Sequence, residues 1–378
     1  MRSRQLILAG LAVLSPVLAQ DPTDQPDPPA PTPTGIDVFA NVTLYEPDGS
    51  VQVTTPRTES LPNNTVLAAW NDPSSKGSIA IYRSTNNGYS WYPLGTATSD
   101  SGKRLLQPHL LYINGTYGDD TGITLLAVNA VDDRTTTIEL YTSGDQGESW
   151  DLASEIASGR PLNNATAAVA SPYPVHNGDS ITVFYTGAGD KTHAQKIVQQ
   201  TTTENYDSWD DPVDVVTPQF PSDQPAAPSI AKIANNKYII AFQYGLRDAN
   251  ASTYTYPIYY KITSNPQKAA SDHTREVRVD TSLVLSGVPS VTWAPLGGAN
   301  GTIVLSDSKS NSVFVNQYLG EGEWWELNTT AGRAFGREVT VPPNDQTKLR
   351  FAGGAEWAGS STSQILITVM DLQKALGA

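Results

Sequence analysis

The sequence has no cysteine in 378 residues, which excludes disulfides, thiolate metal sites and cysteine nucleophiles. Basic residues are also few, because 24 Lys and Arg stand against 38 Asp and Glu and leave a formal net charge of −14. A chain with this charge repels nucleic-acid phosphates and anionic membrane surfaces. The four histidines lack metal-ligand spacing, and there is no phosphate-binding loop or dinucleotide-binding motif. We therefore expect no metal, no cofactor and an uncharged partner.

Glycine, proline and a repeated turn are abundant instead. The stretch SGDQGESW ends at Trp150, and related stretches end at Trp91 and Trp209, 59 residues to either side. A further 116 residues, two periods, lead to Trp325. In such a turn the Asp accepts bonds from backbone amides, the Gly takes a positive φ, and the Trp covers the apolar side of the hairpin. A period of this length, with about four strands in each repeat, predicts a β-propeller.

Each period opens with an apolar segment around a proline or glycine. The six openings lie at Pro56, Pro108, Pro172, Pro228, Pro289 and Gly336. We therefore predict an all-β protein with a single six-bladed β-propeller domain over residues 36–378, its ring closed by the strand IDVFANVTLY beside the last blade. Because the first strand of each blade lines the central channel, the openings should converge on one face and carry the binding site. The ends of the second strands should reach the same face.

The N-terminal segment has the features of a secretory leader. Residues 1–19 combine two arginines, a short apolar core and small residues before a cleavage point, as a signal peptide does. Residues 20–35 are rich in proline and read as an acidic linker. The sequence thus predicts a secreted, extracellular monomer without a membrane span. We expect it to be glycosylated, because seven Asn-x-Ser/Thr sequons follow, at Asn41, Asn63, Asn114, Asn164, Asn250, Asn300 and Asn328.

The predicted blades three to five carry the longest stretches that match a known family. They are VASPYPVHNGDSITVFYTGAGDKTHAQKIVQQTT, SDQPAAPSIAKIANNKYIIAFQYG, YPIYYKIT and WAPLGGANGTIVLS. In order and spacing they resemble glycoside hydrolase family 93, the fungal exo-α-1,5-L-arabinanases, which are sialidase-like six-bladed propellers. The turn motif is similar to the Asp-box of sialidase-like proteins. The resemblance covers most of Arg57 to Leu372, and it implies a carbohydrate partner such as an arabinan-type neutral glycan of plant cell walls.

The resemblance also implies two catalytic glutamates, and this chain has neither. The family pattern Trp-Glu-Pro-Phe corresponds to Ala170–Tyr173, which puts Ser171 at the first glutamate position. The pattern Tyr-Glu-Tyr-Gly corresponds to Phe242–Gly245, which puts Gln243 at the second. Retaining glycosidases use one carboxylate as nucleophile and another as acid/base. A serine without an obvious base and a glutamine are poor replacements near neutral pH.

Three functions are compatible with these substitutions. In the first, the chain binds a neutral glycan without cutting it efficiently. In the second, it is a glycoside hydrolase with relocated carboxylates, for which Asp223, Asp190, Asp72 and Asp307 are candidates. In the third, it is an enzyme of another class on the same scaffold, such as a polysaccharide lyase with His109 or a tyrosine as base. The separation of the carboxylates would distinguish the first two.

Substrate contacts are expected from polar and aromatic residues near the strand openings and the ends of the second strands. These are Arg57, Trp70, Asn71, Asp72, His109, Tyr185, Gln224, Tyr244, Trp293, Asp307 and Arg337. Aromatic rings can stack on sugars, and arginines can bind their hydroxyl or carboxylate groups. Each residue also has a structural alternative, because aromatics pack between blades and arginines pair with acidic neighbours. Asp145 and the tryptophans of the turns are expected at the outer edge, away from the site.

Overall fold

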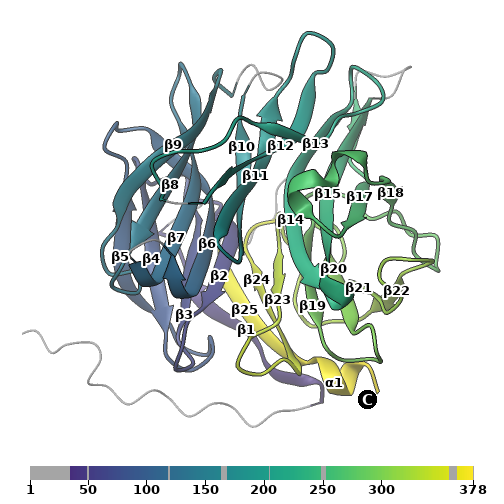
Figure 1. The fold of residues 1–378 in the computed structure, drawn as a ribbon. Helices are drawn as coiled ribbons and strands as arrows, with labels where there is room; N and C mark the ends of the chain where they lie inside the picture. Colours follow the sequence, from purple (N-terminus) through teal and green to yellow (C-terminus); the bar gives the residue numbers. More distant parts are fainter. Residues whose placement is uncertain are drawn as a thin grey trace, which may run out of the picture.

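The computed structural model describes residues 35–48, 51–117, 120–162, 168–203, 205–247, 253–356 and 364–377. The expected leader at 1–19 and residues 20–34 of the expected linker lie outside this part of the chain. Six antiparallel sheets surround a central axis (Figure 1). The prediction of a six-bladed β-propeller is confirmed. None of the described helices is long and apolar enough to cross a membrane.

Each of the first three blades has four strands in chain order from the axis outward. Blade one contains β2 (Thr54–Ser60), β3 (Val66–Asn71), β4 (Ser78–Ser84) and β5 (Tyr92–Thr98). Blade two contains β6 (Arg104–Tyr117), β7 (Asp120–Val131), β8 (Thr136–Ser143) and β9 (Asp151–Gly159). Blade three contains β10 (Ala170–Asn177), β11 (Ser180–Ala188), β12 (Gln195–Thr202) and β13 (Val213–Val216).

The last three blades follow the same plan with small additions. Blade four contains β14 (Gln224–Ile233), β15 (Lys237–Arg247), β17 (Ile258–Thr263) and β18 (Arg275–Glu276), with β16 (Tyr254–Thr255) beside β15. Blade five contains β19 (Ser290–Ala294), β20 (Thr302–Ser306), β21 (Val313–Asn316) and β22 (Trp325–Leu327). Blade six contains β23 (Glu338–Thr340), β24 (Lys348–Gly353), β25 (Ile365–Asp371) and β1 (Asp37–Tyr45). The short helices are η3 (Ala234–Asn236), η4 (Pro266–Ser271) and α1 (Leu372–Ala375).

The N-terminal strand completes the last blade, as predicted. β1 pairs antiparallel with β25, and Val42 lies opposite Ile367. The innermost strands of successive blades contact each other around the whole ring, and β23 returns to β2. The ring is therefore closed by strand pairing between the two ends of the described chain (Figure 1).

The hydrophobic core is divided among the spaces between adjacent blades. Leu125 and Ile138 of blade two, for example, share a buried cluster with Val183 of blade three. Burying one such side chain contributes about 1.5–3 kcal/mol. Because each sheet is covered on both faces by its neighbours, the middle strands read as nearly continuous apolar runs. Packing between blades, and not within one of them, holds the six sheets in place.

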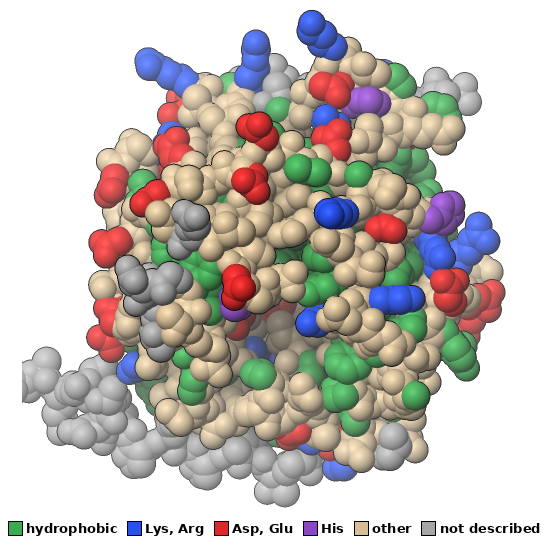
Figure 2. Space-filling view, in the orientation of Figure 1, with side chains coloured by type: hydrophobic (Ala, Val, Ile, Leu, Met, Phe, Trp, Pro, Cys, Tyr) green, Lys and Arg blue, Asp and Glu red, His purple; other side chains and the backbone are tan. Residues whose placement is uncertain are grey.

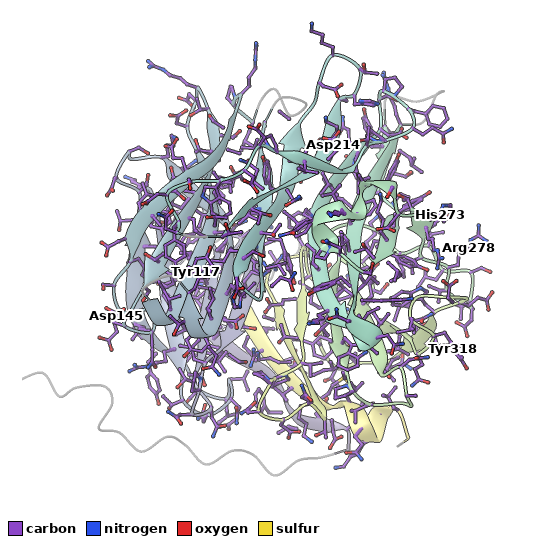
Figure 3. The ribbon with its side chains drawn as sticks, viewed as in Figure 1. Tyr117, Asp145, Asp214, His273, Arg278 and Tyr318 are labelled. Atoms are coloured by element: carbon purple, nitrogen blue, oxygen red, sulfur yellow. The ribbon has the colours of Figure 1, made fainter. Side chains whose placement is uncertain are left out.

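The repeated turn forms the hydrogen bonds that its sequence predicts. The Ser143 hydroxyl donates to the Asp145 carboxylate at 2.8 Å and accepts the Gly147 amide at 2.8 Å. The indole of Trp150 donates to the carbonyl of Gly147 at 3.0 Å, and Gly147 has a φ of 99°. Figure 3 shows Asp145 at the outer edge of the molecule, as expected for a scaffold residue.

The blade-five copy of this turn differs from the expected register by one residue. Trp150 immediately precedes the outer strand of its blade, and the corresponding residue in blade five is Trp324. Trp324 is fully buried against Tyr260, whereas Trp325 begins β22 and is exposed. The assignment of Trp325 to the repeat is therefore wrong. Trp324 lies 115 residues after Trp209, three short of two 59-residue periods, so the count pointed past it to Trp325.

Candidate functional site

A cavity of about 300 Å³ lies on the propeller axis and is lined by residues from all six innermost strands. Figure 2 shows a hollow near the centre of the viewed face, with basic, acidic and histidine side chains around it. The cavity is lined by residues at or next to all six blade openings that the sequence analysis identified. The expected convergence of the openings is therefore observed.

Four innermost strands carry a backbone distortion near the start of the strand. In each, a residue that is not glycine has a positive φ and is followed by proline, and the register shifts by a bulge: these are Thr55 (φ 48°), Gln107 (52°), Ser171 (53°) and Ala227 (53°). Such conformations cost about 1–3 kcal/mol each and collect at functional sites. All four residues line the cavity, so the distortions form a ring at its mouth.

Side chains from neighbouring strands hold the distorted backbone in place. The Ser171 amide donates to the side-chain oxygen of Gln107 at 2.7 Å, and the Gln107 amide donates to the side-chain oxygen of Asn71. The Ala227 amide donates to the Thr186 hydroxyl at 3.0 Å. Asn71, which was predicted as a substrate contact, supports the mouth through its bond with the Gln107 amide.

In five blades the residue after the opening proline, and in blade six Glu338, two residues after Gly336, form a second ring along the cavity wall. Its members, one from each blade, are Arg57, His109, Tyr173, Ser229, Ser290 and Glu338. Four of them bond to the next blade, and the Tyr173 hydroxyl does so by donating to the Ile230 carbonyl at 2.8 Å. Glu338 accepts the Thr58 amide at 2.8 Å, Ser229 accepts the Val291 amide at 3.0 Å, and Ser290 accepts the Val339 amide at 3.0 Å. This ring therefore both lines the cavity and cross-links the blades.

The second ring holds a guanidinium and a carboxylate together with a neutral imidazole. Arg57 donates to the Gly336 carbonyl at 2.9 Å. Burial, and then the positive charge of Arg57, hold the pKa of His109 well below its ordinary value, so the imidazole is neutral near neutral pH. The His109 ring lies 4.0 Å from that of Tyr173, centroid to centroid. Burial raises the pKa of Tyr173 to about 12, so this tyrosine stays protonated.

Two channel carboxylates, Glu59 and Glu338, were missed by the sequence analysis. Glu59 lies two residues beyond Arg57 on β2 and therefore on the same side of the strand. The Arg350 guanidinium of β24 reaches the same region and donates to the Thr58 hydroxyl at 3.1 Å. Burial raises the pKa of Glu59 to about 8, and the charge of Arg350 acts in the opposite direction. Alternation along β2 could have identified Glu59.

Glu59→Gln is expected to remove a pH-dependent destabilisation. The unfolded glutamate has a pKa of about 4.3, and the folded value is about 8, so the folded state keeps a proton that the unfolded state has lost. Stability of the unmodified protein should therefore fall as pH rises from about 4 to 8. At pH 8 the variant should be the more stable by about 1–2 kcal/mol, with a smaller difference at pH 5. Urea unfolding at pH 5 and pH 8 measures the stability difference between the variant and the unmodified protein. An equal difference at the two pH values would contradict the prediction. The control is Glu148→Gln, at an exposed glutamate.

The two positions that the sequence analysis aligned with the family's glutamates lie on adjoining blades. Ser171 is on the cavity wall in β10. Gln243 is on β15, where its Cα lies opposite Ala226, the residue before cavity-lining Ala227. Among the described residues, the buried side-chain oxygen of Gln243 has no hydrogen-bond partner. The geometry is compatible with both positions serving one site.

Three predicted residues gather beside Gln243 in blade four. Asp223 is buried, and this burial raises its pKa, whereas a hydrogen bond with Tyr244 lowers it. The Gln224 amide donates to the Tyr254 hydroxyl at 3.1 Å. Asp223, Gln224 and Tyr244 thus form a polar group at one end of blade four, although none of them lines the axial cavity.

Two predicted aromatic contacts, Trp70 and Tyr185, are wrong. Trp70 is only 2% exposed and packs on Tyr45 and Tyr82, with centroid distances of 4.7 and 5.0 Å. Tyr185 is buried, and its hydroxyl donates to the Gln200 side chain at 2.6 Å. Packing between blades uses both rings. Trp293 does line the cavity, and its indole donates to the Asn300 carbonyl at 3.0 Å.

Arg337 and Asp307 were also expected at the mouth, and the structure places both in the protein interior. Arg337 is fully buried and donates to the Ser306 hydroxyl at 2.8 Å and to the Ser312 carbonyl at 2.6 Å. Asp307 accepts the Ser286 amide at 3.1 Å. Because neighbouring residues of a strand point to opposite sides, it is Glu338 and not Arg337 that faces the cavity.

The remaining carboxylates are engaged in their own loops. Asp72 accepts the Tyr45 hydroxyl at 3.2 Å and the Ser74 amide at 2.8 Å. Asp190 accepts the His193 amide at 2.7 Å and pairs with Lys196 at 3.2 Å, and these bonds lower the pKa of Asp190. With Asp223 and Asp307, the candidates lie in or beside four different blades. Within the described ranges, no group of three His, Cys, Asp or Glu could hold a metal ion.

Comparison with known proteins gives matches among solved structures. No family model and no curated protein matches the chain. The Penicillium chrysogenum α-L-arabinanase complexed with arabinobiose is 29% identical, with a TM-score of 0.84 over 89% of this chain and 99% of that one. The Fusarium graminearum family 93 α-L-arabinofuranosidase, also with arabinobiose, is 28% identical, with a TM-score of 0.83 over 89% and 98%. This chain is a structural relative of glycoside hydrolase family 93.

More distant structures that match this chain share its fold, and the likeness extends no further than the fold. The NanB sialidase of Streptococcus pneumoniae is 10% identical, with a TM-score of 0.59 over 88% of this chain and 70% of that one. The sialidase-like propeller is therefore common to both, without an implied activity.

Proposed function

We propose that this family 93 relative binds a neutral, arabinan-type glycan at the mouth of its axial cavity and hydrolyses it inefficiently or not at all. The observation that carries the proposal is that Ser171 and Gln243 lie on adjoining blades at positions where the family pattern has glutamates. Two solved relatives hold arabinobiose. Neither Ser171 nor Gln243 supplies a carboxylate, whereas both can hydrogen-bond to sugar hydroxyls.

The cavity chemistry supports a neutral ligand. Its volume of about 300 Å³ is at the lower end of small-molecule sites, which suits a chain end or a short sugar unit. Arg57 is offset by Glu338, and His109 is neutral. The ring therefore carries one basic and one acidic side chain, with no excess of either sign. The proposal also places the protein outside the cell, and the leader-like residues 1–19 support this.

A second candidate function is hydrolysis with Asp223 as proton donor. Asp223 is buried with a raised pKa and lies near Gln243 in blade four. A carboxyl group with a raised pKa is suited to act as general acid. Turnover that is lost in Asp223→Asn would favour this candidate over binding alone.

The proposal predicts binding without release of product. The purified protein should bind arabino-oligosaccharides in calorimetry and release little arabinobiose from linear arabinan. His109→Ala should weaken binding about tenfold, because the variant loses the imidazole, one of the hydrogen-bonding side chains that line the cavity. The control is Asp145→Asn, since blade one uses Asn86 at the corresponding place in its turn. Robust release by the unmodified protein, or no binding of any arabino-oligosaccharide, would refute the proposal.

A further inference from the structure

The blade-five turn replaces the scaffold residue of the other turns by a tyrosine. In blades one and two the third residue of the turn, Asn86 or Asp145, accepts a backbone amide four residues later. In blade five the third residue is Tyr318. Asn316 is the first residue of this turn and accepts the amides of Tyr318 and Gly320, both at 2.9 Å, as Ser84 accepts those of Asn86 and Gly88 in blade one.

The turn keeps its backbone shape despite this exchange. Leu319 and Gly320 have φ values of 56° and 82°, and Gln146 and Gly147 in blade two have 61° and 99°. Asn316 is fully buried, and its amide also donates to the Glu321 carbonyl at 2.9 Å. The side chain of Tyr318 therefore takes no part in these hydrogen bonds, and the turn keeps its backbone conformation.

The side chain of Tyr318 forms an exposed aromatic pair with that of Trp325. Tyr318 is 58% exposed and Trp325 is 37% exposed. Their ring centroids lie 5.6 Å apart at an interplanar angle of 57°. Figure 3 shows Tyr318 at the edge of the molecule opposite Asp145. The pair therefore lies on the outside of blade five, away from the axis.

A polar groove adjoins this pair. It has a volume of about 690 Å³, and the turn lines it through Gly320 and Glu321. Arg275 also lines the groove and pairs with Glu321 at 2.6 Å. His273 and Arg278, which also line it, lie on the same edge as Tyr318 in Figure 3. The groove thus offers donors and acceptors for hydroxyl groups beside an apolar platform.

We propose that Tyr318 and Trp325, with the adjoining groove, form a second glycan-binding site, the outer aromatic site. Flat, rigid aromatic rings beside a few polar groups match the apolar faces and hydroxyl rims of sugar rings. Two side chains are too small an area for a stable protein interface, which takes about 1,200 Å² or more. A long glycan held here and at another point on the molecule would be retained more strongly than by either site alone. The outer aromatic site does not depend on the cavity site.

Affinity electrophoresis in gels containing linear arabinan tests the outer aromatic site. Tyr318→Ala combined with Trp325→Ala should weaken retention about fivefold, because stacked aromatic contact is lost. Tyr318→Phe should retain it. The matched control is Val213→Ala, which trims a 43% exposed apolar side chain from the outer strand of blade three.

Calorimetry with arabinobiose on the same variants reports the cavity site separately. The double variant should bind arabinobiose as the unmodified protein does and should keep its melting temperature. Equal retention of the double variant and the unmodified protein, or no retention of either, would overturn the outer aromatic site. Loss of arabinobiose binding in His109→Ala with unchanged gel retention would leave the outer site standing on its own.

Discussion

Replacing Ser171 and Gln243 together by glutamate is expected to raise the release of arabinobiose from linear arabinan at least about a thousandfold. A nucleophile and an acid/base act as a unit, so the full gain needs both carboxylates. The mouth is already shaped for residue 171, because the Gln107 side chain holds its amide at 2.7 Å. Among the described residues, the buried Gln243 side-chain oxygen has no hydrogen-bond partner that the exchange to glutamate would disrupt.

Single variants and a remote variant separate this gain from a general effect of added charge. Ser171→Glu and Gln243→Glu alone should both stay close to the unmodified rate. Gln146→Glu is the matched control, because Gln146 is exposed and, like Ser171, has a positive φ. Reducing-sugar release under substrate excess measures the rate. No gain in a double variant that melts normally would mean that the correspondence with the family's glutamates is wrong.

Removal of the Arg337 guanidinium is expected to destabilise the propeller by about 3–5 kcal/mol. Arg337 is fully buried between blades five and six. It donates to the carbonyls of Asn311, Ala331, Gly332 and Ser312 and to the Ser306 hydroxyl. Arg337→Met leaves these acceptors without their donor, and each buried orphan costs about 1–3 kcal/mol. It also removes a positive charge that interacts with Asp307.

Urea unfolding of Arg337→Met against Arg333→Met tests this effect. Arg333 pairs with Glu356 at 2.8 Å, but its side chain is 54% exposed, so its loss should cost less than about 1 kcal/mol. Arg337→Lys should fall between the two, since an ammonium reaches fewer acceptors. A loss within about 1 kcal/mol for Arg337→Met would contradict the structural role and reopen a role in binding.

The fold was predictable because its signals are local and repeated. The 59-residue spacing of Trp91, Trp150 and Trp209 indicates equal units, and each turn carries its own hydrogen bonds. The same regularity misplaced Trp325, because the distance from Trp209 to the equivalent Trp324 is 115 residues and not the 118 of two full periods. The residues of each turn therefore predict the turn itself better than counting 59-residue periods predicts its position in the sequence.

The residues of the site were predictable only where the sequence shows which side chains of a strand face the channel. A bulge adds one residue and reverses which side chains face the channel. Prolines mark four of these bulges, and the cavity position of His109 follows from its neighbour Pro108. The sixth opening has no proline, so Gly336 was aligned with the prolines of the other openings and Arg337 was predicted in place of Glu338. Burial of Trp70 and Tyr185 depends on the adjoining sheets, which no local pattern reveals.

Strand β1 has a consequence for the order of synthesis. Its partner strand is made last, and the bond between the Asn41 amide and the Thr368 hydroxyl joins residues 327 positions apart. At about 5–20 residues per second, translation of the intervening chain takes about 15–65 seconds. During that interval β1 has an unpaired edge, and blade six cannot close. Five blades can assemble on the ribosome, whereas the ring closes only after nearly the whole chain has emerged.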